Sequence, residues 1–300
     1  MERIAYLNGS FVKESEATIS VFDRGFIHGD AAFDALRTFR HVPFRVNDYL
    51  DRFFRSLRYM QIRSPLSREE WQGVITELIE RNLPMMGEDD DSTIMLRITR
   101  GSSLKDILDC GPTNYLAVCK PIPFQTFARQ YREGIHVIVP TRRRIPAESV
   151  SPLAKNHNRL NLTLAELEAK MLDPQALPLL LDPSGNVSES SAMNFFMVQD
   201  GALLTPTGNC LDGITRKTIV ELAEDLEIEA REENFDMYAL YNADEAFLCS
   251  TTPVILPIAK INGRGVGEQV PGPITRKLCE AWSRLVGVDF VAQAERHVRA

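Results

Sequence analysis

The chain has 300 residues, of which 44% are hydrophobic and 25% charged, as is typical of a globular protein with a sizeable core. Its formal net charge is -7 and its pI is about 5.4, so neither nucleic acid nor an anionic membrane is expected as the main partner. No stretch reaches the ~18–20 apolar residues of a membrane span, and the N-terminus lacks the apolar core of a signal peptide. The sequence therefore predicts a cytoplasmic protein.

Cysteine and histidine usage disfavours both a disulfide framework and a metal centre. The five cysteines show no Cys-x-x-Cys spacing, and the five histidines form no His-x-x-x-His pair. We therefore expect no metal, and we expect a reducing compartment. Neither a Gly-x-Ser-x-Gly elbow nor a Gly-x-Gly-x-x-Gly loop occurs, so hydrolase and dehydrogenase activities have no support.

The first part of the chain alternates between strand and helix signals. YLNGSFV predicts a hairpin around an Asn-Gly turn, and AAFDALRTF and HVPFRV predict two further strands. Apolar residues at helical spacing run from Asn47 to Met60, and a capping box at Ser67 and Glu70 predicts the start of a second helix. STIMLRITRG and YLAVCKPI then predict two strands.

Pro121 and Pro123 stiffen the chain after the last of these strands, which favours a domain boundary. We expect a small N-terminal α/β domain over residues 1–120, a linker over residues 121–128, and a larger C-terminal domain over residues 129–300.

The second part continues with strands, helices and frequent hairpins. IHVIVPTRR predicts a strand, and its basic triplet, residues 142–144, is interpreted as a solvated loop or strand end. A helix from Lys155, strands around Gly185 and Gly201, a helix after Gly213, the strand EAFLCST and a last helix near residues 275–285 follow. Interleaved elements with many hairpins favour an α+β fold over a doubly wound parallel sheet.

Lys155 and Glu189 stand in segments that suggest chemistry. Lys155 precedes a polar stretch, NHN, at the start of a helix whose apolar line runs through Leu160, Leu164 and Leu167. Glu189 lies in Ser-Glu-Ser-Ser between a glycine turn and the apolar strand MNFFMV. On local grounds alone, Lys155 could equally be a surface lysine and Glu189 a carboxylate in a turn.

The segment LDGITRKTIVEL predicts an anion site. Gly213 lets the backbone approach an anion, and the N–H groups of Ile214 and Thr215 open an amphipathic helix of the kind that binds phosphate. An ordinary glycine turn before a capped helix is the alternative. With Lys155 forming a Schiff base and Glu189 at a pyridine nitrogen, the combination fits a site for pyridoxal 5'-phosphate (PLP), a cofactor that stabilises carbanions.

In order along the chain, these segments resemble the class IV aminotransferases, which are the PLP enzymes of fold type IV. The resemblance covers nearly the whole chain and runs through FDRGFIHGDAAFDALRTF, YLDRFFRSL, TRGSS, AKNHNRLNLTLAELEAK, GNVSESSAMNFF, LDGITRKTIVELA, DEAFLCSTTPVILPI and GPITRKL. It implies a two-domain α+β fold and a homodimer whose active site lies between the domains and is shared by the subunits.

The resemblance also implies the role of each cofactor-binding residue. Lys155 is similar in position to the Schiff-base lysine and Glu189 to the partner of the pyridine nitrogen. The residues implied around the phosphate are Arg52, Ser250, Ile214, Thr215 and Thr251. Without the resemblance, Arg52 would be an ordinary surface arginine. Arg159, expected one helical turn after Lys155, could lower the pKa of that lysine.

The activity implied is transamination between a branched-chain amino acid, a D-amino acid or an amine and a 2-oxo acid. A lyase of the aminodeoxychorismate type is the alternative on this scaffold, and a non-catalytic binding protein is a third hypothesis. No subfamily signature is complete, because Thr93 and Met95 stand where branched-chain enzymes carry a Tyr-x-Arg pair. The residues expected to contact the substrate are Phe33, Arg37, Lys105, Arg159 and Thr252.

Overall fold

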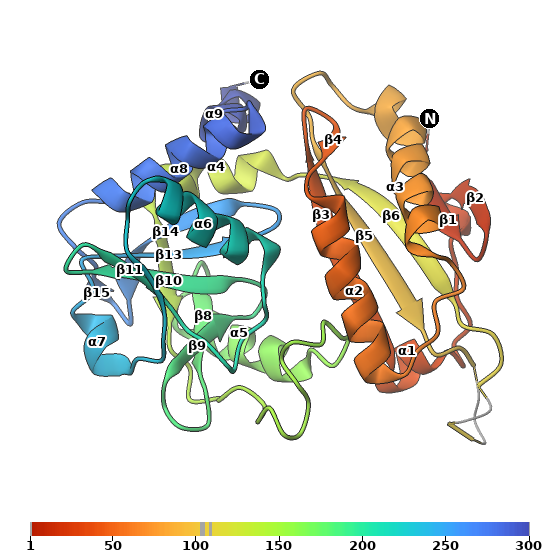
Figure 1. The fold of residues 1–300 in the computed structure, drawn as a ribbon, viewed down its shortest axis with the longest axis horizontal. Coiled ribbons are helices and arrows are strands. Elements are labelled where there is room, and N and C mark those ends of the chain that lie inside the picture. Colours follow the sequence, from red (N-terminus) through yellow and green to blue (C-terminus); the bar gives the residue numbers. More distant parts are fainter. Residues whose placement is uncertain (1, 103–105, 108–109, 300) are drawn as a thin grey trace. The chain divides into compact units, whose positions relative to one another are not determined.

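The computed structural model describes residues 2–102, 106–107 and 110–299. The chain forms two compact units (Figure 1). Unit 1 comprises Met1–Ile122 and Ala154–Arg159, and unit 2 comprises Pro123–Leu153 and Leu160–Ala300. Helices and strands are interleaved in both units, as the α+β expectation requires.

Unit 1 contains a six-stranded antiparallel sheet with the strand order β2-β1-β6-β5-β3-β4. Its elements are β1 (Ile4–Leu7), β2 (Ser10–Lys13), η1 (Glu14–Glu16), α1 (Arg24–His28), β3 (Ala31–Phe39), β4 (Val42–Pro43), α2 (Val46–Met60), α3 (Arg68–Asn82), η2 (Leu83–Met85), β5 (Ser92–Thr99) and β6 (Tyr115–Pro121).

Local sequence signals account for several of these boundaries. The predicted hairpin is confirmed: β1 and β2 flank Asn8 and Gly9, whose φ angles of 48° and 94° suit the mirror-image turn that matches the twist of the strands. The predicted capping box is also confirmed, because Ser67 and Glu70 bond reciprocally at the start of α3. Helices α2 and α3 cover one face of the sheet (Figure 1).

The opposite face of this sheet is partly exposed. Strand register places Phe33 opposite Arg97, and Ala35 opposite Met95, which is opposite Val118 in turn. These five residues are partly exposed, whereas their neighbours along each strand are buried. Because side chains alternate between faces along a strand, the five share one face, and Arg97 is the charged residue among them. The buried pair Arg37 and Thr93 continues the same face.

Unit 2 is built on a nine-stranded sheet with the order β12-β11-β10-β13-β14-β7-β8-β9, and β15 pairs with β14. Its elements are α4 (Phe124–Glu133), β7 (Ile135–Ile138), α5 (Leu160–Leu172), β8 (Leu177–Leu181), β9 (Val187–Ser190), β10 (Asn194–Gln199), β11 (Ala202–Thr205), α6 (Ile214–Asp225), β12 (Ala230–Glu232), α7 (Met237–Tyr241), β13 (Glu245–Ser250), β14 (Val254–Ile261), β15 (Arg264–Gly265), α8 (Pro273–Val286) and α9 (Phe290–Arg299).

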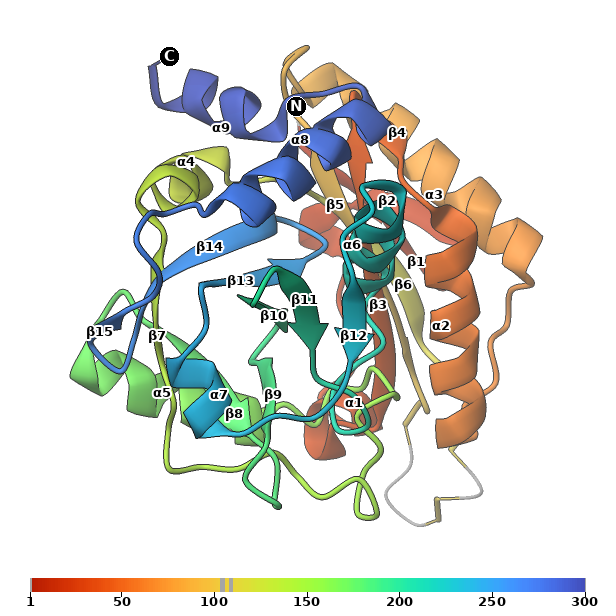
Figure 2. The same ribbon diagram turned by 60° about the vertical axis from the view of Figure 1, so that its left-hand side comes forward.

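One additional pairing closes this sheet into a ring. Glu189 of β9 pairs with Asn194 of β10, so β10, β13, β14, β7, β8 and β9 return to their starting strand. Helices α6 and α8 pack against β13 and each other, α5 packs on β8, and α4 packs on β14 and α9 (Figure 2). The closure places Glu189 at a fixed point of the strand framework.

The observed division of the chain differs from the expected linker over residues 121–128. Strand β6 continues to Pro121 and α4 begins at Phe124, so no extended linker separates them. The fixed φ of Pro123 at the N-cap and the buried residues Phe124, Ala128 and Tyr131, at helical spacing, explain why this segment is helical. Residues 154–159 also belong to unit 1 rather than to the C-terminal part of the chain.

The C-terminal end carries one more helix than expected. The predicted last helix corresponds to α8, and α9 follows it after Gly287, whose φ of 69° ends α8 in the left-handed region. Fully buried Phe290 anchors α9 against Tyr131 of α4, with ring centroids 5.4 Å apart. In the described part of the chain, no helix has the length and apolar character needed to cross a membrane.

Candidate active site

Lys155 is held by its backbone at the edge of the unit 1 sheet. Its carbonyl accepts a hydrogen bond from the Phe33 N–H at 3.0 Å, and the next residue, Asn156, bridges Ala32 in antiparallel fashion. The Lys155 N–H donates to Ser56 Oγ of α2 at 3.0 Å. The main chain of the lysine is therefore bonded on both sides, which leaves the side chain to project from a fixed origin.

This location corrects the expectation that Lys155 begins a helix. Helix α5 starts only at Leu160, and the intervening Asn158 N–H bonds the side-chain oxygen of Asn156 at 2.8 Å in an Asx turn. Arg159 is consequently not one helical turn beyond the lysine. The asparagines favour local side-chain bonds over helical ones, and β3 supplies the backbone partners that a helix would have used.

The Lys155 side chain lies over an aromatic ring within a group of basic residues. Its Nζ is 4.6 Å from the Phe33 ring centroid, the Arg159 guanidinium carbon is 5.7 Å from that centroid, and the His157 ring lies 5.2 Å away. Burial, with the positive charges of Arg97 and Arg159, lowers the pKa of His157 to about 4, so its ring is neutral at physiological pH. We call these five residues the Phe33 cluster.

Arg52 is buried in unit 1 rather than exposed. Its Nη2 and Nε donate to the two oxygens of Asp34 at 2.6 and 3.0 Å, a bidentate geometry that orients the guanidinium plane. Ser56, one turn later on α2, donates to the Arg52 carbonyl and accepts from the Lys155 N–H. This turn of α2 therefore brings Arg52 and Lys155 into one neighbourhood. Asp34 and Ser56 were not anticipated, because neither carries a local motif.

Arg37 has a different environment from the one expected for a substrate-binding residue. Only 2% of it is exposed, its Nη2 lies 3.9 Å from Asp91, and its guanidinium stacks 4.0 Å from the Phe39 ring centroid. Its Nε donates to the Thr38 carbonyl. These contacts hold Arg37 inside unit 1, where the nearby carboxylate offsets the cost of burying its charge. Lys105, the other cation proposed for the substrate, lies outside the described residues.

Glu189 is buried in unit 2 and its carboxylate is held by several donors. One oxygen lies 2.9 Å from Arg144 Nη2, and the other accepts from the Leu211 N–H at 3.1 Å and from Asn194 Nδ2 at 3.4 Å. The side chains of Glu189 and Arg144 are 9% and 10% exposed. A charged carboxylate in this position is compensated by an opposite charge and by hydrogen bonds.

Arg144 is a site residue that sequence reasoning missed. The interpretation of residues 142–144 as solvated is wrong for Arg144, although Arg142 remains exposed beside Glu168. Pairing of this segment with β8, through the Arg144 N–H and the Leu181 carbonyl at 2.9 Å, fixes its direction. Three consecutive arginines give no indication of which one turns inward, and only the strand pairing decides it.

The start of α6 offers unpaired backbone donors next to this carboxylate. Gly213 is the N-cap and no side chain caps the helix, while Ile214 and Thr215 are both buried. A Cβ on Gly213 would collide with Asn194 Oδ1. Asn194 also donates to the Leu211 carbonyl at 2.8 Å, so the loop before α6 is tied to Glu189 through shared partners.

The predicted hydroxyl groups lie in a tight connection of the same unit. Ser250 ends β13 opposite Val254, the first residue of β14, so Thr251 and Thr252 lie in a three-residue loop. Pro253 closes the loop, and its carbonyl accepts from the Tyr131 hydroxyl at 2.7 Å. Since α6 packs against β13, unit 2 collects the helix start and the hydroxyl loop on neighbouring elements.

Two cysteine thiols of unit 2 have raised pKa values and are therefore protonated at neutral pH. Burial raises the pKa of Cys210 to about 12, with a further contribution from Glu189, and burial also raises that of Cys279 to about 12. In the part of the chain that the structure describes, no three His, Cys, Asp or Glu side chains gather as metal ligands.

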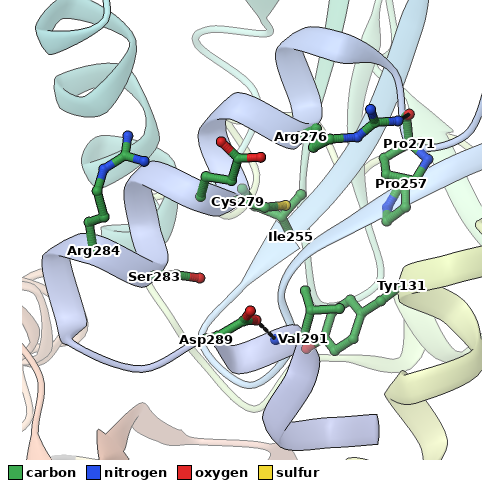
Figure 3. A pocket seen from close by; sticks show the side chains of 11 residues that line it. Tyr131, Ile255, Pro257, Pro271, Arg276, Cys279, Ser283, Arg284, Asp289 and Val291 are labelled. Atoms are coloured by element: carbon green, nitrogen blue, oxygen red, sulfur yellow. Dashed lines mark hydrogen bonds between the residues drawn. The ribbon is translucent and has the colours of Figure 1, made fainter.

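A cavity of about 480 Å³ in unit 2 is separate from these residues (Figure 3). Its floor includes Ile255 and Tyr131, and the charged side chains of Arg276, Arg284 and Asp289 surround it. None of the predicted site residues lines it. Those three charged residues are exposed, as is Glu280, and the hydroxyl of buried Tyr131 is already bonded to the Pro253 carbonyl.

The donor groups present are those that PLP requires. Unit 1 supplies a lysine amine for the aldehyde and a buried arginine oriented by a carboxylate. Unit 2 contains a charge-compensated carboxylate, which suits a protonated ring nitrogen, and a helix start without a side-chain cap, which suits a phosphate. The class of protein that these groups define is a PLP enzyme.

Comparison with known proteins gives the same class. The family model for amino-transferase class IV matches residues 31–261. A Methanocaldococcus jannaschii protein provisionally named a branched-chain-amino-acid aminotransferase is 35% identical, over 92% of this chain and 93% of its own length. The D-alanine aminotransferase of Staphylococcus haemolyticus is 30% identical, over 94% of this chain and 97% of its own.

A solved structure agrees with these sequence matches. The T.th. branched-chain amino acid aminotransferase complexed with N-(5'-phosphopyridoxyl)-L-glutamate superposes with a TM-score of 0.85 and 26% identity, covering 96% of this chain and 95% of that one. The chain belongs to the class IV aminotransferase family. It is a PLP-dependent aminotransferase of the two-domain fold type IV architecture, and these matches favour transamination over the lyase alternative.

Proposed function

We propose that the protein transfers the amino group of a branched-chain amino acid to a 2-oxo acid. The observation that carries the proposal is the position of Lys155, whose Nζ lies 4.6 Å from the ring centroid of Phe33 on the partly exposed face of the unit 1 sheet. Ala35, Met95 and Val118 share that face and suit an aliphatic substrate side chain. The name of the Methanocaldococcus jannaschii relative supports the same substrate class.

Each unit contributes separate cofactor contacts in this proposal. Lys155 holds the cofactor through Nζ, and Glu189, compensated by Arg144, faces the ring nitrogen. Further contacts to the phosphate come from Arg52, Ile214, Thr215, Ser250 and Thr251. When bound, PLP supplies the electron sink that stabilises negative charge at the substrate carbon.

The protein's own part in the reaction is proton transfer and orientation. Lys155 Nζ would take the proton from the donor's α-carbon and would return it to the carbon that is protonated in the product. The backbone of Lys155 is anchored, which would hold Nζ near the carbon that loses the proton and the carbon that gains it. Phe33 and Thr252 are proposed to contact the substrate, as is Arg159.

A D-amino acid is the second candidate donor. The Staphylococcus haemolyticus relative is named a D-alanine aminotransferase and matches over nearly its whole length. Both candidate donors carry a carboxylate beside the reacting carbon. Because their configurations at that carbon are opposite, they would present opposite faces to Lys155.

We also propose a cytoplasmic homodimer. Val21, Phe22 and Phe26 of unit 1 are 66%, 55% and 73% exposed, and a cluster of large apolar side chains of this kind suits a subunit interface. All five cysteines are free, which fits a reducing compartment. Sedimentation equilibrium tests the assembly, and a monomer at micromolar concentration would contradict it.

A spectral half-reaction tests the substrate. PLP-loaded protein is mixed, without an acceptor, with L-leucine, L-glutamate, D-alanine, D-glutamate or (R)-1-phenylethylamine. Loss of the bound cofactor's visible band with L-leucine is the expected result. Loss only with D-alanine would transfer the assignment to the second candidate, and no loss with any donor would overturn transamination.

A further inference from the structure

We propose that Arg97 is the residue that binds a carboxylate of the substrate beside Lys155. The proposal rests on the function proposed above and adds a binding residue that the sequence did not indicate. Arg97 lies on β5 directly opposite Phe33 of β3, on the partly exposed face of the unit 1 sheet.

The geometry brings Arg97 close to the lysine. Side chains directly opposite each other on antiparallel strands have Cβ atoms about 4.5–5.5 Å apart. Phe33 is therefore contacted from one side by the Lys155 amine, 4.6 Å from its ring centroid, and neighboured on the adjacent strand by Arg97. In this proposal the substrate has its reacting carbon at Nζ and its carboxylate at the Arg97 guanidinium.

Unlike the buried arginines of unit 1, partly exposed Arg97 has no carboxylate partner among the described residues. Arg52 is paired with Asp34 and Arg37 with Asp91. Within the described residues, the contact recorded for the Arg97 guanidinium is a weak one, from Nη2 to Met95 Sδ at 3.5 Å. A partly buried guanidinium without a carboxylate is costly in a folded chain, so a ligand anion is the partner that the site requires.

The charges of the Phe33 cluster favour an anion as well. Arg159 and Lys155 lie around the same ring, and Arg97 and Arg159 both contribute to the lowered pKa of His157. Asp23, the carboxylate that acts in the opposite direction on His157, already accepts from the Gly25 N–H, Thr99 Oγ1 and Asn114 Nδ2. Burial lowers the pKa of Arg97, because desolvation disfavours the charged guanidinium.

The test measures binding without turnover. Titration calorimetry on PLP-loaded protein uses 4-methylpentanoate, 4-methylpentanamide, which has the same carbon skeleton without the charge, and glutarate. We expect Arg97→Met to weaken 4-methylpentanoate about 10- to 100-fold, the effect of losing a charge-assisted hydrogen bond, and to leave the amide unchanged. Arg97→Lys should restore part of the carboxylate preference.

The control is Arg58→Met, an exposed arginine on α2, which packs on the other face of β3. It should bind all three probes like the wild type. Loss of affinity for both acids assigns Arg97 to the carboxylate beside the reacting carbon, and loss confined to glutarate assigns it to a second carboxylate. Unchanged affinity for both acids in Arg97→Met overturns the proposal.

Two further readouts separate this proposal from the others. The half-reaction with (R)-1-phenylethylamine, which has no carboxylate, should be insensitive to Arg97→Met wherever the wild type accepts that amine. The His157 pKa, followed by NMR, should rise in Arg97→Met but stay below the ordinary value of 6.5, because burial and Arg159 still lower it in a folded variant and not in an unfolded one. A wild type that binds 4-methylpentanoate but transaminates nothing would refute the proposed function and leave Arg97 as a carboxylate-binding residue.

Discussion

The two units hold their principal charged groups in opposite ways. In unit 2, Glu189 lies in a closed ring of strands and is surrounded by donors from Arg144, Asn194 and Leu211. In unit 1, Lys155 is bonded through its backbone, while its amine lies over an aromatic ring. The carboxylate is thus surrounded by hydrogen-bond donors, whereas the lysine has an anchored backbone and an amine beside an aromatic face.

The largest expected effect concerns the lysine. Lys155→Ala should lower the rate of amino transfer by at least about 10²–10⁴-fold, because it removes the group that moves the proton. Single-turnover kinetics with L-leucine measures this. Lys170→Ala, which removes an exposed lysine paired with Glu166 at 2.8 Å, is the control and should keep the wild-type rate. Full activity in Lys155→Ala would remove the lysine from the mechanism.

Breaking the ion pair of unit 2 should have the next largest effect, on stability. Arg144→Met leaves the Glu189 carboxylate buried without its cation, which costs about 3–5 kcal/mol of unfolding free energy. Arg142→Met, whose partner contact is 3.6 Å and whose side chain is 49% exposed, should cost less than about 1 kcal/mol. Urea denaturation compares the two variants. Equal losses of unfolding free energy would show that burial does not make the Arg144 ion pair matter more to stability than the exposed Arg142 contact.

Gly213→Ala tests whether the start of α6 is shaped for an anion. The added Cβ meets Asn194 Oδ1, so the loop must shift, and we expect PLP affinity to fall about tenfold, or about 1.4 kcal/mol. Gly73→Ala in α3 is the matched control, because nothing lies within 4 Å of its Cβ. Fluorescence titration of the two apoproteins with PLP gives the affinities. An undiminished affinity in Gly213→Ala would separate the helix start from the phosphate.

The smallest expected effect is the pH dependence that His157 imposes on unit 1. Its folded-state pKa of about 4 lies below the ordinary value of 6.5, so the unfolded chain binds the extra proton between these values. Stability should fall as the pH drops from 6.5 towards 4, by less than about 1.4 kcal/mol per pH unit because the ring is partly exposed. Above pH 6.5 His157 should contribute no slope.

Thermal unfolding of the wild type and His157→Gln across this range checks the prediction. The variant should lose less stability than the wild type as the pH falls, since the carboxylates that also titrate there are common to both. Parallel curves for the two proteins would place the His157 ring in contact with water.

Much of the framework follows from local signals. The Asn8-Gly9 hairpin and the capping box of α3 depend on residues at fixed short spacings, and both were predictable. The helical start at Phe124 was missed, because two nearby prolines indicate a stiff connection as readily as a helix N-terminus. Lys155 was found, but its pairing with β3 depends on a strand more than a hundred residues earlier.

By itself, the sequence determined the α+β fold, because that depends on periodicity and short spacings, and its motifs carried the resemblance that implied the family and the cofactor. Only the tertiary structure decided which arginines pair with a carboxylate and which one lies opposite Phe33. Arg37 and Arg97 lie in predicted strands and Arg52 in a predicted helix, and no local pattern distinguishes their environments. Asp91 and Asp34 approach the first two, and Phe33 lies opposite the third. Such pairings arise from strand register and long-range packing, which no local pattern encodes.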